Sequence, residues 1–144
     1  MGLFDAVRKS FNKPSPVHHT SESEQAERRP EEEPAPIVVP EIQPADLIPV
    51  YEAGNAPRML DCREPYEWHQ VHIPGSLHIP MNQIPARLAE LDPTDEWIVV
   101  CAHGNRSFSV AGYLIHNGYR ASSLAGGVTD WWMRGGKTER GVRR

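Results

Sequence analysis

The chain has 144 residues, 39% of them hydrophobic, and a formal net charge of −4 from 15 Lys and Arg against 19 Asp and Glu. This length allows one domain at most, and the weak acidic balance disfavours a general nucleic-acid binder, because nothing attracts phosphate backbones at long range. No apolar run approaches the ~20 residues that a membrane-spanning helix needs. The first residues lack the pattern of a secretory leader, so we expect a reducing, cytoplasmic setting in which two cysteines form no disulfide framework.

Residues 1–36 differ in composition from the rest of the chain. Their start predicts a short amphipathic helix, because apolar residues recur there at helical spacing: Leu3, Phe4, Val7 and Phe11. Such a helix suits peripheral contact with a membrane or a protein through residues 3–11. A frayed terminus is the alternative, since a helix of about eleven residues is marginal alone in water. Five prolines and an acidic run then predict a disordered linker up to residue 36.

From residue 37 onward, short apolar runs alternate with helical patterns. Strands are expected at 37–39, 58–62, 77–79, 97–101 and 119–124, and helices at 44–53, 65–69, 82–91, 107–117 and 128–133. This alternation is typical of an α/β domain with a mainly parallel central sheet flanked by helices. We place the domain at residues 37–134. The tail at 135–144 is expected to be basic and flexible, on the basis of these residues: Lys137, Arg140, Arg143 and Arg144, against Glu139.

One expected strand leads directly into a glycine-containing loop and a helix start. The segment is Cys101-Ala102-His103-Gly104-Asn105-Arg106-Ser107. The carboxyl edge of a parallel sheet is where α/β proteins bind ligands, and the amides of a helix N-terminus stabilise an anion there. These features and Arg106 favour a thiolate at Cys101, so a nucleophile is predicted rather than a cysteine that only packs in the core. Gly104 allows the backbone to turn without a side chain in the way.

The loop resembles the active-site loop of rhodanese-type sulfurtransferases. Other segments match that family in the same order over roughly residues 40–134: Leu60-Asp61-Cys62-Arg63 with Glu67 downstream, His72-Ile73-Pro74-Gly75-Ser76, Ile79-Pro80, and Leu124-Ala125-Gly126-Gly127 before Trp131 or Trp132. The resemblance implies a single rhodanese-like domain whose cysteine accepts a sulfane sulfur from thiosulfate or a persulfide donor. The resulting persulfide passes the sulfur to cyanide or a thiol, without a metal or an organic cofactor.

Within that scheme the resemblance makes Cys101 the nucleophile. The remaining loop residues bind the substrate, mainly through backbone amides, and Arg106 adds charge for the donor anion: Ala102, His103, Gly104, Asn105, Arg106 and Ser107. Four residues separate Cys101 from Arg106, whereas rhodanese-like phosphatases have five, so phosphate chemistry is the weaker alternative. The other alternative is a weakly catalytic or non-catalytic module for sulfur relay or binding, localised by its N-terminal helix.

Charged residues near the loop are expected to support it. The resemblance assigns Asp61 and Arg63 to the surroundings of the active site, with Asp61 bonding either the loop or Arg63, and Arg63 pairing with Glu67. Cys62 is expected to be buried and not to face Cys101, because neighbouring strand residues point to opposite faces of a sheet.

The histidines and tryptophans are given mainly structural roles. His103 either tunes the thiolate or is an exposed loop residue. No metal site is expected, because the other histidines lack cysteine or carboxylate partners at ligand spacing: His69, His72 and His78. One of Trp131 and Trp132 is expected in the core and the other at the mouth of the site.

Overall fold

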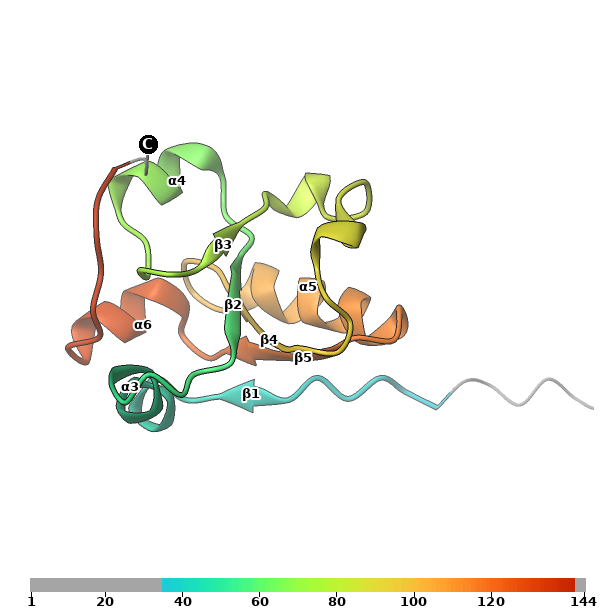
Figure 1. Ribbon diagram of the computed structural model, residues 1–144, viewed down its shortest axis with the longest axis horizontal. Coiled ribbons are helices and arrows are strands. Elements are labelled where there is room, and N and C mark those ends of the chain that lie inside the picture. The colour runs from blue at the N-terminus through green and yellow to red at the C-terminus, as the bar shows by residue number, and fades with distance from the viewer. Residues whose placement is uncertain (1–34, 142–144) are drawn as a thin grey trace, which may run out of the picture. The chain divides into compact units, whose positions relative to one another are not determined.

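We describe the protein from a computed structural model, in which residues 35–141 are described. The predicted helix at 3–11 and almost all of the predicted linker lie outside these residues, as do the last three residues of the tail. The chain divides into two units, residues 1–35 and 36–144, and the strands and helices of the described residues all lie in the second. The predicted α/β class holds for this unit, whose five strands form a fully parallel sheet flanked by helices (Figure 1).

The sheet has the strand order β1-β5-β4-β2-β3. Its strands are β1 (Glu41–Ile42), β2 (Arg58–Asp61), β3 (Leu77–His78), β4 (Glu96–Val100) and β5 (Arg120–Leu124). The order places β4 in the centre, between β5 and β2, with Val99 opposite Leu60 on one side and Ser123 on the other. A central strand of a parallel sheet is covered on both faces and is therefore apolar throughout, as the buried run from Trp97 to Val100 shows.

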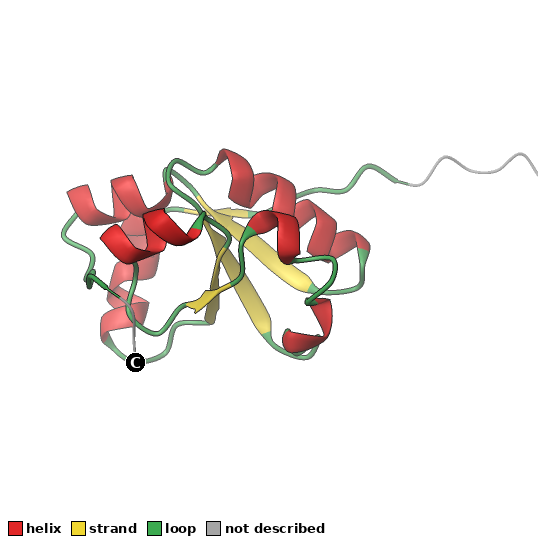
Figure 2. Cartoon of the chain, turned by 90° about the horizontal axis from the view of Figure 1, so that it is seen from above, coloured by secondary structure: helices red, strands yellow, loops and turns green. Residues whose placement is uncertain are grey.

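Helices cover both faces of the sheet (Figure 2). They are α3 (Pro44–Glu52), α4 (Pro65–Gln70), α5 (Asn105–His116) and α6 (Gly127–Met133), with two 3-10 turns, η1 (Met81–Gln83) and η2 (Leu88–Glu90). Side chains of β4 alternate between two cores, as strand geometry requires. Val99 joins the core under α5, and Ile98 joins the core under α3 and α6, which includes the fully buried Trp131.

Two predicted elements differ from the structure. The helix predicted at 82–91 is replaced by η1 and η2. Pro85 lies inside that segment, and in a continuous helix it would have no N–H to donate and its ring would crowd the preceding turn. The strand predicted at 37–39 starts later, at Glu41. Pro40 cannot donate to a ladder, so pairing with β5 begins at the Pro40 carbonyl, which accepts the Ser123 N–H at 2.9 Å. The other strands and helices lie within two residues of their predicted bounds.

The first part of the C-terminal tail is held against the domain, which corrects the prediction of a flexible end for residues 135–141. Glu139 exchanges two backbone hydrogen bonds with His72 in an antiparallel bridge, at 2.8 and 2.9 Å. The Trp131 indole donates to the Lys137 carbonyl at 2.9 Å, and the Gly141 N–H donates to the His69 carbonyl at 2.9 Å. Figure 1 shows this segment running from α6 to α4, and we call residues 136–141 the strap.

Candidate active site

The loop that follows β4 carries the predicted nucleophile. Cys101 directly follows the buried strand, and α5 begins at Asn105 after Gly104, whose φ of +102° is a left-handed conformation that favours glycine. The first backbone bond of α5 runs from the Phe108 N–H to the Gly104 carbonyl at 3.2 Å. The amides of residues 105–107 precede it and therefore have no acceptor within the helix, so the positive end of α5 faces the loop.

The sulfur of Cys101 lies inside this loop, and the residue is 1% exposed. The Gly104 N–H donates to Sγ at 3.0 Å, and the thiol lies 3.3 Å from the Ser107 hydroxyl. Ser107 Oγ also donates to the Gly104 carbonyl at 3.1 Å and lies 2.7 Å from the hydroxyl of Ser123. Sγ is thus surrounded by hydrogen-bonding groups rather than by apolar side chains alone, an arrangement that stabilises negative charge on sulfur.

A pair of glycines after β5 lets the start of α6 pack closely against the nucleophile loop. Gly126 and Gly127 both have positive φ, at +70° and +61°, and lead into α6. The next two amides of α6 donate to the loop, Val128 to the Cys101 carbonyl at 2.8 Å and Thr129 to the Ala102 carbonyl at 3.2 Å. These bonds require a close approach of the two backbones. The conformation of the nucleophile loop therefore depends on α6 as well as on its own sequence.

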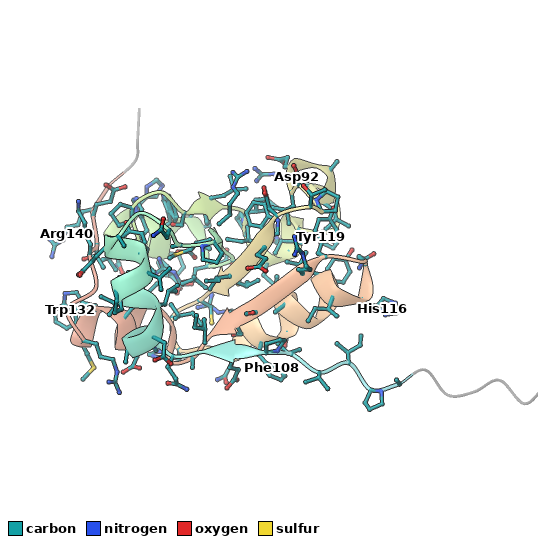
Figure 3. The ribbon with its side chains drawn as sticks, turned by 60° about the horizontal axis from the view of Figure 1, so that its bottom comes forward. Asp92, Phe108, His116, Tyr119, Trp132 and Arg140 are labelled. Carbon is teal, nitrogen blue, oxygen red and sulfur yellow. The ribbon has the colours of Figure 1, made fainter. Side chains whose placement is uncertain are left out.

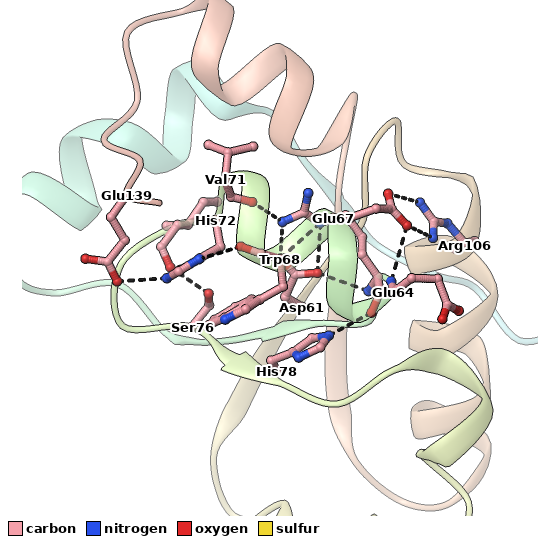
Figure 4. Close-up of polar contacts among 12 residues, drawn as sticks. Asp61, Glu64, Glu67, Trp68, Val71, His72, Ser76, His78, Arg106 and Glu139 are labelled. Carbon is pink, nitrogen blue, oxygen red and sulfur yellow. Dashed lines mark hydrogen bonds and ion pairs between the residues drawn. The ribbon is translucent and has the colours of Figure 1, made fainter. Parts of the chain in front are cut away.

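Arg106 is paired with a carboxylate on α4. Its Nη1 and Nη2 donate to the two carboxylate oxygens of Glu67 at 2.7 and 2.9 Å (Figure 4). The hydrogen bonds from Arg106 lower the pKa of Glu67, and those to Glu67 raise the pKa of Arg106, so both groups are charged at neutral pH. Arg106 therefore does not offer an uncompensated charge to a donor anion, and the bidentate pair ties α4 to the start of α5.

Arg63 is bonded to Asp61, so the expected pair of Arg63 with Glu67 is wrong. Asp61 is fully buried and accepts from the Arg63 backbone N–H at 3.0 Å and from its guanidinium at 2.7 to 3.1 Å. The guanidinium also donates to the Val71 carbonyl at 2.7 Å. Asp61 was expected to bond either the loop or Arg63, and in the structure it bonds Arg63. The short loop after β2 bends back far enough for this pair, which leaves Glu67 to meet Arg106.

Cys62 is buried, as expected, but it lies on the same side of the sheet as Cys101. The register of β2 and β4 pairs Asp61 with Val100, and one further residue along brings Cys62 beside Cys101 in the same core. Alternation does not separate them, because it applies within one strand, whereas these two residues occupy equivalent positions on neighbouring strands. Burial, and then the charge of Cys101, raise the pKa of Cys62 to about 12, so Cys62 stays a neutral thiol.

A cavity of about 970 Å³ opens beside Ala102. It is bounded by Glu67 and its neighbours on α4, by Trp132 on α6, and by Thr138 and Arg140 of the strap. Figure 3 shows Trp132 and Arg140 on the same side of the molecule. The strap thus forms one wall of the cavity. As expected of this tryptophan pair, Trp131 is buried in the core and Trp132, which is 63% exposed, borders the opening.

His72 connects the strap to α4. Its Nε2 lies 2.8 Å from Oε1 of Glu139 and its Nδ1 lies 2.9 Å from the Trp68 carbonyl (Figure 4). The ring stacks on the indole of Trp68 at a centroid distance of 3.7 Å, and His78 stacks on the same indole at 4.9 Å. His72 and His78 thus pack against Trp68, as expected of structural histidines.

The predicted loop residues do not all lie at the sulfur. Gly104 and Ser107 contact Sγ, whereas His103 and Asn105 are exposed. Sequence reasoning missed Ser123, which nothing in the sequence distinguishes from its neighbour Ser122 on the same strand; only its burial against Ser107 does so. It also missed Glu139, for which the sequence holds no signal, because the bridge to His72 joins residues 67 positions apart.

Neither a metal cluster nor a membrane-spanning helix is found in residues 35–141. No group of three or more His, Cys, Asp or Glu side chains in this range is arranged to hold a metal ion. No helix in the same range is long and apolar enough to cross a membrane.

The chain matches known proteins both in sequence and in structure. Residues 45–134 match the rhodanese-like domain family. A putative sulfurtransferase of Bacillus subtilis, YtwF, is 33% identical over 93 residues, which cover 65% of this chain and 90% of YtwF. The thiosulfate sulfurtransferase GlpE of Stutzerimonas stutzeri is 36% identical over 74 residues, or 51% of this chain and 70% of GlpE. The crystal structure of a rhodanese-related protein from Thermoplasma volcanium matches with a TM-score of 0.64 and 31% identity, covering 69% of this chain and 97% of that one. The chain therefore belongs to the rhodanese-like domain family, and its relatives point to sulfur transfer.

Proposed function

We propose that the protein is a thiosulfate sulfurtransferase that works through a persulfide on Cys101. The observation that carries the proposal is the setting of Sγ, which accepts the Gly104 N–H at 3.0 Å at the positive end of α5. A sulfur in this position is stabilised as an anion before the reaction, and the same donors meet the terminal sulfur of a persulfide after it. The thiosulfate sulfurtransferase GlpE among the relatives supports thiosulfate as the donor.

The first half-reaction transfers one sulfur atom. The Cys101 thiolate attacks the outer sulfur of thiosulfate, the new S–S bond forms as the original S–S bond breaks, and the electron pair of that bond leaves with sulfite. The charge of −3 on thiolate and thiosulfate together equals that on persulfide and sulfite. Because the total charge is conserved while it moves between sulfur atoms, fixed amide dipoles at the loop serve the step without a proton transfer.

Arg106 has an indirect role in this scheme. Its guanidinium is bonded to both oxygens of Glu67, so the charge of the donor is met chiefly by the backbone amides at the start of α5. The ion pair fixes the direction in which α5 begins and hence the aim of those amides. We infer that the Glu67–Arg106 pair positions the loop, and that it is not the principal binding group for the donor.

The second half-reaction returns the cysteine. A thiophilic acceptor such as cyanide or a thiolate attacks the terminal sulfur of the persulfide, and Cys101 leaves as a thiolate. For cyanide the products are thiocyanate and the free enzyme. The cavity beside Ala102 is the route we propose for the acceptor, because it borders the loop.

Steady-state turnover tests the proposal. Purified protein is mixed with thiosulfate and cyanide, and thiocyanate is measured for the wild type, Cys101→Ser and Cys62→Ser. We expect turnover by the wild type and by Cys62→Ser, and none by Cys101→Ser. Thiocyanate formation by Cys101→Ser at the wild-type rate would overturn the assignment of the nucleophile. Absence of turnover with thiosulfate, combined with efficient loading of Cys101 by a protein persulfide, would replace the proposal with the relay module.

A further inference from the structure

We propose that Ser123 is a positioning residue for the nucleophile: its buried hydroxyl donates to Ser107 and thereby turns Ser107 into a better donor to the charged sulfur of Cys101. The inference deepens the proposed function, because it concerns the same sulfur. It is carried by contacts that do not depend on which donor or acceptor the protein uses.

The three side chains form a chain that leads away from the reacting atom. Cys101 Sγ lies 3.3 Å from Ser107 Oγ, which lies 2.7 Å from Ser123 Oγ. Both serines are fully buried. Ser123 belongs to β5 and Ser107 to α5, so the contact joins the helix that bears the loop to the sheet beneath it.

The direction of the Ser107–Ser123 hydrogen bond follows from counting protons. Ser107 has one hydroxyl proton, which it donates to the Gly104 carbonyl at 3.1 Å. Within residues 35–141, Ser107 is the one hydrogen-bond partner of the Ser123 hydroxyl. If Ser107 donated to Ser123, the proton of Ser123 would be buried without an acceptor, which is costly. Ser123 therefore donates and Ser107 accepts.

Ser107 can change partner when the thiol ionises. In the neutral state the thiol donates to Ser107, and Ser107 donates to Gly104. When Cys101 loses its proton, the Ser107 hydroxyl can turn to donate to the sulfur across the same 3.3 Å. The Gly104 carbonyl is not left without a donor, because it keeps the Phe108 N–H at 3.2 Å. The rotation thus exchanges one bond for another and leaves no buried group unpaired.

Ser123 strengthens the hydrogen bond between Ser107 and Cys101 when the sulfur is a thiolate and weakens it when the sulfur is a neutral thiol. A hydroxyl that accepts one hydrogen bond becomes a stronger donor, because bonds in a chain polarise one another. The same hydroxyl becomes a weaker acceptor for a second donor. The donation from Ser123 therefore strengthens the bond from Ser107 to a thiolate and weakens the bond from a neutral thiol to Ser107. Both effects favour the anion at Cys101.

Other charged and titratable groups face Cys101 and must stay unchanged in a test. They are Cys62 from the strand end after β2, whose raised pKa of about 12 keeps it neutral, and Arg106 on α5, which is paired with Glu67 of α4. Neither contacts Ser123 among the described residues. A substitution at Ser123 leaves these groups in place, so its effect on the sulfur can be assigned to the hydroxyl chain.

The test is the pH profile of Cys101 alkylation by iodoacetamide, measured in Ser123→Ala. We expect the midpoint of the profile to move to higher pH and alkylation at pH 7 to slow about threefold. Ser122→Ala is the matched control, because the neighbouring serine on β5 is outside the hydroxyl chain. Ser123→Thr keeps the hydroxyl and should alkylate at the wild-type rate. Alkylation by Ser123→Ala at the rate of Ser122→Ala would overturn the inference.

A second comparison identifies the route of the effect. If Ser123 acts through Ser107, Ser123→Ala should change the alkylation rate in the wild-type background and leave it unchanged in Ser107→Ala. An equal effect in both backgrounds would also overturn the inference. Alkylation requires no sulfur donor, so these results stand even if thiosulfate fails to load Cys101. In turnover assays that do succeed, Ser123→Ala should lower kcat without raising KM for thiosulfate.

Discussion

Replacement of Gly127 by alanine probes how closely α6 must approach the nucleophile loop. A Cβ at this position would lie 2.2 Å from the Cys101 carbonyl oxygen and 2.5 Å from the carbonyl carbon and oxygen of Ala102. All three are backbone atoms, so no side chain can rotate to make room. The φ of +61° adds a conformation that alanine rarely adopts. The loop and α6 must therefore separate.

The loss in free energy of unfolding caused by Gly127→Ala follows from the backbone strain and the hydrogen bonds that would be lost. The left-handed conformation costs about 1 to 2 kcal/mol for a residue with a Cβ. Separation breaks the bonds from Val128 to the Cys101 carbonyl and from Thr129 to the Ala102 carbonyl, each worth about 1 kcal/mol or more where the acceptor stays buried. The sum is about 3 to 5 kcal/mol. Gly118→Ala is the control, since Gly118 also has a positive φ, +88°, but its Cβ would meet nothing within 4 Å. We expect it to cost about 1 to 2 kcal/mol.

Urea denaturation and thiosulfate loading together test this expectation. Gly127→Ala should lose about 2 to 3 kcal/mol more than Gly118→Ala in free energy of unfolding, from the two broken loop bonds. At a urea concentration where both variants are folded, Gly118→Ala should load sulfur at the wild-type rate and Gly127→Ala should load slowly or not at all. Equal stability and equal loading in the two variants would refute the claim that α6 fixes the loop.

Three further predictions concern ionisation and the strap. The pKa of Cys62 is raised from 9.0 to about 12, so between these values the folded state keeps a proton that the unfolded chain loses. The free energy of unfolding should therefore fall between pH 9 and 12, by at most about 1.4 kcal/mol per pH unit, and denaturation curves of Cys62→Ala should show a flatter dependence. The pKa of Glu67 is lowered from 4.5 by Arg106, so the ion pair stabilises the fold fully above pH 4.5 and this contribution is lost as the pH falls. In urea denaturation Glu67→Gln should lower the free energy of unfolding by about 1 kcal/mol at pH 7, and a dependence of stability on acid pH unchanged from the wild type would contradict this. Glu139→Gln weakens the contact with His72, so exchange of the amide of Gly141 should quicken about tenfold while amides of β4 keep their protection.

The fold was largely predictable because its signals are local. Short apolar runs and turn residues marked the strands, and the motif at Cys101–Ser107 marked the loop. The helix expected at 82–91 was wrong because Asn82 is a good helix cap but Pro85 follows it inside the segment, where a continuous helix needs a backbone N–H. The start of β1 was misplaced for a similar reason at Pro40.

The supporting residues of the site were harder to predict because their partners are distant in the chain. Arg106 and Glu67 are 39 positions apart, and no local spacing distinguishes this pair from one between Arg63 and Glu67. Only the three-dimensional path of the loop after β2, which returns Arg63 to Asp61, decides between them. Motif matching therefore located the loop around the nucleophile, whereas the ion pairs that hold it required coordinates.

The central claim is that sulfur is carried on Cys101, and the intact mass of the protein after incubation with thiosulfate tests it most directly. We expect a gain of about 32 Da, one sulfur atom on an activated thiol, that disappears on addition of cyanide and persists in Cys62→Ser. The gain should be absent in Cys101→Ser. A cyanide-sensitive gain of the same mass in Cys101→Ser, or no gain in the wild type, would contradict the claim.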